Sequence, residues 1–411
     1  MNIEKAMEIL RKYPLCDHCL GRLFARLGVG LSNDERGRAI KDYLLMSIHE
    51  RIMSSEASED LINDLKALAL SGHEPSIKLL KGMGIEVNPV PCYVCGGSIF
   101  NRLDEWARSI ADALSRLNVE FNTFRLGSKI PIDVLRRELE ISAEFNIASA
   151  ESIKRELNRE LGKRVSAITG KPFSREKPDL EVVIDTVSGS LNIQLMPIYL
   201  FTRYRKIHRV TSKRRIKWPI ESIIRIFGAQ GILIHSGGDE AGNVRVLGNG
   251  RPMVLQIIRP SKRPSINDVI KMISNDGFDV VFNGLSEVRA FTVRRVKDRV
   301  RDYIVTYRAL VMVNGQVSEE ALRSLRDYFR NRQVVQRLRV GGRVRRRVGL
   351  VYELDGRVIG EGLVEFLIRC QGNLSVKGFI HGLYGDVEPS ISGMLGVEAR
   401  PIEIDILNII D

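Results

Sequence analysis

The sequence has 411 residues, enough for two or three domains that each bury a hydrophobic core. Its hydrophobic fraction is 44%, and no apolar run approaches the ~20 residues that a membrane-spanning helix needs. The charged N-terminus is unlike a secretory signal peptide, so we expect a cytoplasmic protein. Lysine and arginine number 63 against 50 acidic residues, a net charge of +13 that favours an anionic partner.

The first part of the chain predicts helices. Apolar residues recur at helical spacing in residues 5–13, 36–53, 58–70 and 103–118. A surface helix of a globular protein has this pattern because only one stripe of it faces the core.

A small mixed unit follows these helices. Residues 121–131 alternate like a strand, and residues 148–165 predict a helix with Ser149 as its N-cap. Residues 180–187 and 191–200 are strand-like runs joined by a Ser-Gly-Ser turn, which predicts a hairpin. We therefore place a first domain over residues 1–200.

From residue 201 the pattern changes to β-rich runs with interspersed helices. Helices are predicted at residues 216–228 and 318–331, the second with Ser318 as its N-cap. The predicted strands are residues 244–248, 252–258, 279–285, 302–313, 348–354 and 363–370. These proportions indicate an α+β fold, with a mixed or antiparallel sheet domain over residues 201–411.

Positive charge is concentrated in three clusters. Residues 201–217 contain eight lysines and arginines without an acid, residues 337–347 contain six arginines without an acid, and residues 293–301 alternate basic and apolar side chains. A charged surface that serves only solvation, as in thermophile proteins, mixes positive and negative side chains. Clusters of positive charge alone therefore favour a polyanionic binding partner. A membrane surface is the weaker alternative, because none of the clusters lies on an obvious amphipathic helix and arginine is preferred over lysine.

Four cysteines form two Cys-x-x-Cys pairs, Cys16 with Cys19 and Cys92 with Cys95. Two such turns complete a tetrahedral Zn²⁺ site, and the 72 residues between Cys19 and Cys92 would make it a long-range clasp. Disulfides, free buried thiols or a redox pair are the alternatives. A cytoplasmic setting and the lack of a thioredoxin-like βαβ pattern disfavour disulfides and a redox pair. Cys370 stands alone and is interpreted as a core thiol.

Several segments, in order along the chain, resemble the archaeal Pus-ten family of tRNA pseudouridine synthases. CDHCLGRLF and CYVCGG resemble its zinc segments, and FNTFRLGSKIP resembles its THUMP-type RNA-binding module. IYLFTRYRKIHR and NVRVLGNGRPMVLQI resemble its catalytic half. The resemblance implies a monomer that acts on tRNA, at the uridines that open the T-loop, with structural zinc, no cofactor for catalysis, and no membrane or small-molecule partner.

The chemistry implied by this resemblance needs a carboxylate that initiates glycosidic cleavage, an aromatic ring against the flipped base, and a cation that holds the carboxylate. The matching candidates are Asp239 or Glu240 as the carboxylate, Tyr307 as the ring, and Arg251 and Lys377 as cations. The resemblance and the first basic cluster together give the remaining substrate contacts: Arg203, Tyr204, Arg205, Lys206, Arg214 and Arg215.

The catalytic loop departs from the family's Gly-Arg-Glu-Asp sequence. Aligned backwards from Arg245 without a gap, the family's aspartate falls on Ala241, whereas aligned forwards from Ser236 it falls on Glu240, beside Asp239. The alternative function is therefore a catalytically impaired or non-catalytic tRNA-binding protein on the same scaffold. A THUMP-linked methyltransferase is weaker, because no glycine-rich cofactor loop follows a strand in the second half.

Overall fold

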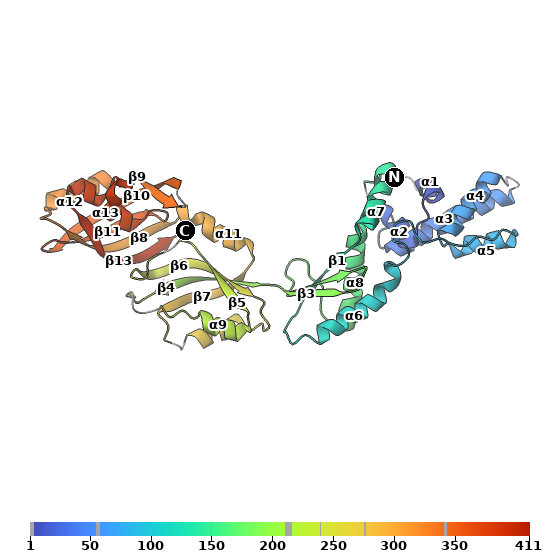
Figure 1. Ribbon diagram of the computed structural model, residues 1–411, viewed down its shortest axis with the longest axis horizontal. Helices are drawn as coiled ribbons and strands as arrows, with labels where there is room; N and C mark the ends of the chain where they lie inside the picture. Colours follow the sequence, from blue (N-terminus) through green and yellow to red (C-terminus); the bar gives the residue numbers. More distant parts are fainter. Residues whose placement is uncertain are drawn as a thin grey trace. The chain divides into compact units, whose positions relative to one another are not determined.

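The computed structural model describes residues 4–54, 58–148, 150–209, 216–238, 240–274, 277–340 and 343–411. The chain divides into two compact units, Met1–Met196 and Pro197–Asp411. Figure 1 shows the first unit in blue to green and the second in yellow-green to red. Among the described residues, no helix is both long and apolar enough to cross a membrane.

The first unit begins with a run of helices. Their bounds are α1 (Glu4–Lys12), α2 (Asp17–Leu23), α3 (Asn33–Met53), α4 (Glu59–Leu70), α5 (Glu74–Gly82), the 3-10 helix η1 (Phe100–Arg102) and α6 (Leu103–Ser115). The helices predicted from apolar spacing are confirmed. A capping box between Ser32 and Glu35 begins α3. The backbones of α2 and α3 touch, since a methyl group on Gly21 would collide with the Asn33 carbonyl.

A three-stranded sheet with two helices completes this unit. Its elements are β1 (Phe124–Lys129), α7 (Ile132–Glu144), α8 (Ile153–Thr169), β2 (Leu180–Asp185) and β3 (Leu191–Leu195). β1 pairs with β2 in parallel, and β2 and β3 form the predicted antiparallel hairpin. The N-cap prediction was wrong: the hydroxyl of Ser152 accepts a hydrogen bond from the Arg155 N–H and begins α8, while Ser149 lies outside the described residues.

The second unit is built on a ten-stranded sheet. The strands are β4 (Ile198–Lys206), β5 (Gly231–Ser236), β6 (Arg245–Ile258), β7 (Val280–Val288), β8 (Ile304–Val313), β9 (Arg332–Val340), β10 (Arg343–Gly360), β11 (Leu363–Gln371), β12 (Val387–Glu388) and β13 (Ala399–Ile410). Their order is β12-β9-β10-β11-β8-β13-β6-β4-β7, with β5 paired to β6. Only β13 and β6 pair in parallel among the described strands of this sheet, so the sheet is mixed.

Helices and alternating strand side chains form the core of the second unit. The helices are α9 (Ile220–Phe227), α10 (Ile266–Ile273), α11 (Phe291–Asp298), η2 (Arg299–Arg301), α12 (Glu319–Phe329), α13 (Val376–His381), η3 (Leu383–Gly385) and α14 (Ile391–Leu395). Every second residue of β8 is buried, and these residues share one core with α12 and α13. Ser318 caps α12 as predicted. The α+β fold class is confirmed.

Several predicted strand boundaries differ from the structure. Separate strands were predicted at residues 244–248 and 252–258, but Arg245–Ile258 forms the single strand β6. The run predicted at residues 191–200 is divided at Met196–Pro197 between β3 of the first unit and β4 of the second. Apolar alternation alone does not show where a chain passes from one sheet to another.

Candidate active site and metal centre

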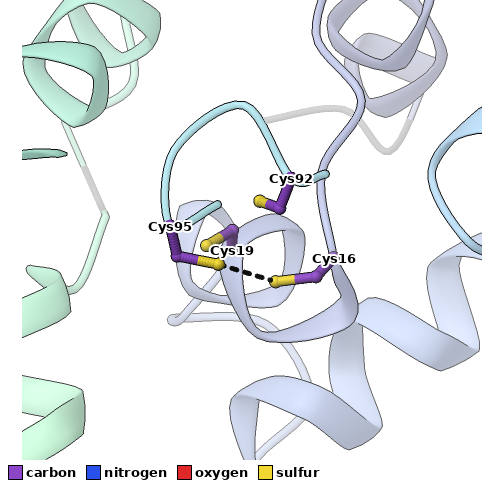
Figure 2. A group of neighbouring side chains, drawn as sticks. All are labelled: Cys16, Cys19, Cys92 and Cys95. Atoms are coloured by element: carbon purple, nitrogen blue, oxygen red, sulfur yellow. Dashed lines mark hydrogen bonds between the residues drawn. The ribbon is translucent and has the colours of Figure 1, made fainter. Parts of the chain in front are cut away.

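The two cysteine pairs meet in the first unit. Cys16 precedes α2 and Cys19 lies within it, while Cys92 and Cys95 lie on the loop before η1. All four sulfurs lie within 4.8 Å of one another, and Cys16 Sγ and Cys95 Sγ are 3.6 Å apart (Figure 2). Sulfurs bound tetrahedrally at about 2.3 Å from Zn²⁺ lie ~4 Å from one another, so this set is slightly wider than a closed zinc site. The four thiols can hold a metal ion.

The surroundings of the thiols favour the charged form of one cysteine and oppose that of another. Hydrogen bonds from the neighbouring thiols, Cys16 first, lower the pKa of Cys92. Burial raises the pKa of Cys19, although the guanidinium of Arg22 opposes this shift. The Arg22 Nη2 atom lies 3.5 Å from Cys19 Sγ. A divalent metal would supply the positive charge that four thiolates need.

Polar contacts connect the cysteine cluster to the three-stranded part of the same unit. Arg22 is buried and donates to Glu138 on α7. His18 Nδ1 lies 2.8 Å from Glu156 Oε1 on α8, and the His18 ring stacks on Phe100 at 4.1 Å. α2 and its N-cap residue Cys16 therefore supply two of the thiols, and α2 also anchors α7 and α8.

In the second unit, Glu240 lies on the loop between β5 and β6 and its side chain is only 8% exposed. Its carboxylate accepts hydrogen bonds from the Tyr204 hydroxyl, which is 2.9 Å from each oxygen. Arg251 Nε lies 2.9 Å from Glu240 Oε2, and Lys206 Nζ lies 3.6 Å from Oε1. The structure therefore gathers one carboxylate, two cations and a phenol.

Strand register explains why these side chains converge. Tyr204 and Lys206 are two residues apart on β4, so they point to the same face. Tyr204 is the cross-strand partner of Arg251 on β6. The same cations also hold the loop, because Arg251 Nη1 donates to the Gly237 carbonyl and Lys206 Nζ donates to the Ala241 carbonyl, each at 2.9 Å. We call Glu240, Tyr204, Lys206, Arg251 and Tyr307 the Glu240 cluster.

Tyr307 completes this cluster from β8. It is 7% exposed, and burial raises its pKa while the nearby Arg251 opposes that rise. Burial also works against the charge of Arg251, but Glu240 and the two tyrosines hold its pKa above the ordinary value. At neutral pH the phenol of Tyr307 is therefore neutral and Arg251 is charged.

The other predicted substrate contacts are placed differently. Arg203 donates to the carbonyls of Gly250 and Ile409 and pairs with Asp411, so it anchors the chain's last strand. Arg205 is half-buried on the face of β4 opposite Lys206. Lys377 is exposed at the beginning of α13 and forms no ion pair with Glu240 in the described part of the chain. Asp239, Arg214 and Arg215 lie outside the described residues.

A second buried carboxylate was missed by the sequence reasoning. Asp405 on β13 is 1% exposed and pairs with Arg209 at 2.7 Å, with Arg245 at 2.7 Å and with Arg308 at 3.3 Å. Asp405 and Arg245 are register partners on β13 and β6. The available signal was an aspartate directly between two isoleucines in the strand ARPIEIDILNII, which indicates a buried, paired charge.

Two family models and several related proteins show which class of protein this chain belongs to. Residues 106–185 match the family described as the archaeal Pus10 THUMP domain, and residues 199–410 match the one described as Pus10, C-terminal. A "tRNA pseudouridine synthase Pus10" from Vulcanisaeta distributa is 62% identical over 412 residues and aligns with 100% of both chains. Another from Caldivirga maquilingensis is 39% identical and aligns with 99% of both. The chain belongs to the Pus10 family of tRNA pseudouridine synthases, which confirms the Pus-ten resemblance.

The chain has a more distant similarity to a chain in the crystal structure of a Cbf5–Nop10–Gar1 complex. It shares 17% identity with this chain at a TM-score of 0.32, over 51% of this chain and 48% of that one.

Proposed function

We propose that this protein converts uridine to pseudouridine in tRNA, at one or both of the uridines that open the T-loop, and that it works as a cytoplasmic monomer. Family membership supports the reaction class. The reaction breaks the N1–C1′ bond, turns the base and forms a C5–C1′ bond. The C5 proton is lost and N1 gains one, so atoms and electrons balance without an oxidant or a small-molecule cofactor.

The Glu240 cluster supports this proposal most directly. A carboxylate that attacks or deprotonates the nucleoside must be ionised and fixed in place. Arg251 and Lys206 supply positive charge to Glu240, and the Tyr204 hydroxyl donates to both of its oxygens. We assign Glu240 as the reacting carboxylate and Tyr307 as the aromatic ring that meets the flipped base.

Single substitutions in the loop test this assignment. Glu240→Gln keeps the size of the side chain but removes its charge, so we expect pseudouridine formation on an unmodified tRNA transcript to fall on the order of 10³-fold or more. Binding of tRNA should stay nearly unchanged, because the carboxylate does not contact phosphate. Asp239→Asn is the matched control and should keep most of the activity.

Three other results would change the assignment. Loss of activity in Asp239→Asn alone would make Asp239 the reacting carboxylate. Full activity in the Asp239→Asn, Glu240→Gln double variant would place the reactive group outside this loop. Wild-type protein that binds tRNA without forming pseudouridine would refute the enzymatic proposal. In that case, a gain of activity in Ala241→Asp would identify position 241 as the one that corresponds to the family's catalytic aspartate.

We also propose that Cys16, Cys19, Cys92 and Cys95 bind one structural Zn²⁺. Four converging sulfurs are the donor set that Zn²⁺ prefers in closed structural sites, and three of the four cysteines are buried. Metal analysis should give one zinc per chain. The Cys92→Ser, Cys95→Ser variant should lose it, whereas Cys370→Ala, which changes a buried thiol of the second unit, should retain it.

A further inference from the structure

The third basic cluster of the sequence lies on a helix. The alternating pattern of residues 293–301 predicts no amphipathic helix, but the structure places them in α11 and η2. Val296 is buried and Val300 is half-buried, four residues apart on the inner side. The outer side carries exposed cations at Arg294, Arg295, Lys297, Arg299 and Arg301. We call these five residues the α11 basic face.

This helix borders the loop that carries Glu240. α11 packs against β5 and β6, the two strands that the loop connects (Figure 1). The Tyr303 hydroxyl donates to the Val296 carbonyl at 3.3 Å, and a methyl group added to Gly237 would lie 2.8 Å from the Tyr303 ring. A methyl group on Gly238 would lie 3.8 Å from Val300 and would also meet Arg251. η2 and the Glu240 loop are therefore close neighbours.

The charge on this face is available, in contrast to that of three cations of the first basic cluster. Among the described residues of that cluster, Arg203, Lys206 and Arg209 are engaged with carboxylates or carbonyls of the protein. On α11, only Arg294 forms an ion pair with a described residue, Asp298 at 3.1 Å, and its side chain is 88% exposed. The other four cations form none within the part of the chain that the structure describes.

We propose that the α11 basic face holds the phosphate backbone of the substrate RNA beside the Glu240 loop, a role that rests on the proposed function. A base that leaves its stack to reach Glu240 keeps its own phosphate and those of its neighbours within one nucleotide of the loop. Cations without protein partners next to that loop are the groups that can receive those phosphates. Arginine predominates among them, as expected for contacts with phosphate oxygens.

Charge removal tests this surface against a matched control. The Arg295→Ala, Lys297→Ala, Arg299→Ala, Arg301→Ala variant loses four cations. The Lys262→Ala, Lys271→Ala, Arg323→Ala, Arg330→Ala variant loses the same number of exposed cations elsewhere on the second unit. Affinity for the tRNA transcript is measured at several salt concentrations. For the α11 variant, the slope of log affinity against log salt should become shallower by roughly 0.7–0.9 per lost phosphate contact, and the affinity should fall about 10- to 1,000-fold.

The control variant should keep the wild-type slope and affinity, and KM of the α11 variant should change more than kcat. The milder pair Arg299→Gln and Arg301→Gln provides the same test if the fourfold variant folds poorly. An unchanged slope in both α11 variants, an equal loss in the control, or wild-type protein that does not bind tRNA would overturn the proposal. Wild type that binds tRNA but forms no pseudouridine would refute the enzymatic function alone, and the slope would still decide whether this face binds RNA.

Discussion

Glu240 and Asp405 are both buried carboxylates among cations of one sheet, but the groups around them differ. Asp405 lies on β13 and is paired with guanidinium groups from Arg209, Arg245 and Arg308, which stay charged at any ordinary pH. Glu240 lies on a loop, and its described partners include a phenol and an ammonium group besides one guanidinium. Permanent charges on a regular strand suit a structural ion network. Hydroxyl and ammonium partners around a loop suit a group that reacts.

Among substitutions that test the difference between the two carboxylates, Asp405→Asn should have the largest effect, and this effect is on stability. Three arginines would lose their buried counter-charge, so the free energy of unfolding should fall by about 3–5 kcal/mol. Hydrogen exchange of the β8 and β13 amides in the full chain measures this change. Glu403→Gln is the control: Glu403 pairs with Arg209 but is 40% exposed, and its loss should cost less than about 1 kcal/mol. A stable but inactive Asp405→Asn variant would reverse the roles given to the two carboxylates.

Arg251→Gln tests the role of the cations around Glu240, and its effect should be on kcat. Removing the cation 2.9 Å from Glu240 should lower kcat about 100-fold, because the carboxylate loses the nearer of the two cations that the described residues place beside it. Affinity for tRNA should change little, since Arg251 is 3% exposed. Lys377→Gln, which changes the alternative cation predicted from the sequence, should leave kcat close to wild type. A larger loss in Lys377→Gln would mean that the two cations exchange roles when RNA binds.

Tyr204→Phe should have a smaller effect. It removes the hydroxyl that donates to both oxygens of Glu240, a charge-assisted interaction worth about 1.5–3 kcal/mol. We expect about a tenfold lower kcat and a modest fall in the thermal unfolding midpoint. Tyr199→Phe is the matched control on the opposite face of β4, and both quantities should stay at their wild-type values. Equal effects of the two substitutions would show that the hydroxyl of Tyr204 has no special role.

The smallest expected effect is the response to acid. Burial opposes ionisation of Asp405, but Arg245 and Arg209 hold its pKa below the ordinary value. A carboxylate with a lowered folded-state pKa stabilises the protein fully above its unfolded pKa of about 3.9, and this stabilisation is lost as pH falls through the folded pKa. Unfolding measured between pH 5 and pH 3 should show a smaller acid-dependent loss in Asp405→Asn than in wild type. An identical loss would show that other carboxylates control acid unfolding.

The sequence predicted the scaffold better than the chemistry. Helical spacing located half of the α-helices among the described residues, and Ser318 was correctly predicted as an N-cap. The two Cys-x-x-Cys pairs predicted the cluster of possible metal ligands found among the described residues. The protein partners of individual cations were not predicted. Arg203 and Lys206 were expected to face substrate, yet both have protein partners, because composition shows how many cations a segment has and not which carboxylates other strands bring to them.

What the sequence determined by itself follows from local rules. The period of two in strands and of 3.6 in helices determines which side of each element is apolar. The Cys-x-x-Cys spacing predicts a turn that can present two thiolates to a metal. Both patterns extend over only a few residues, so the sequence shows them directly. The tertiary structure alone decided that β13 and β6 pair in parallel, which places Asp405 against Arg245 across 160 residues of chain. It also decided that β4, β6 and β8 bring Tyr204, Arg251 and Tyr307 to the Glu240 loop. Strand order and register depend on long-range packing, and a small shift in either would send the same side chains to other partners.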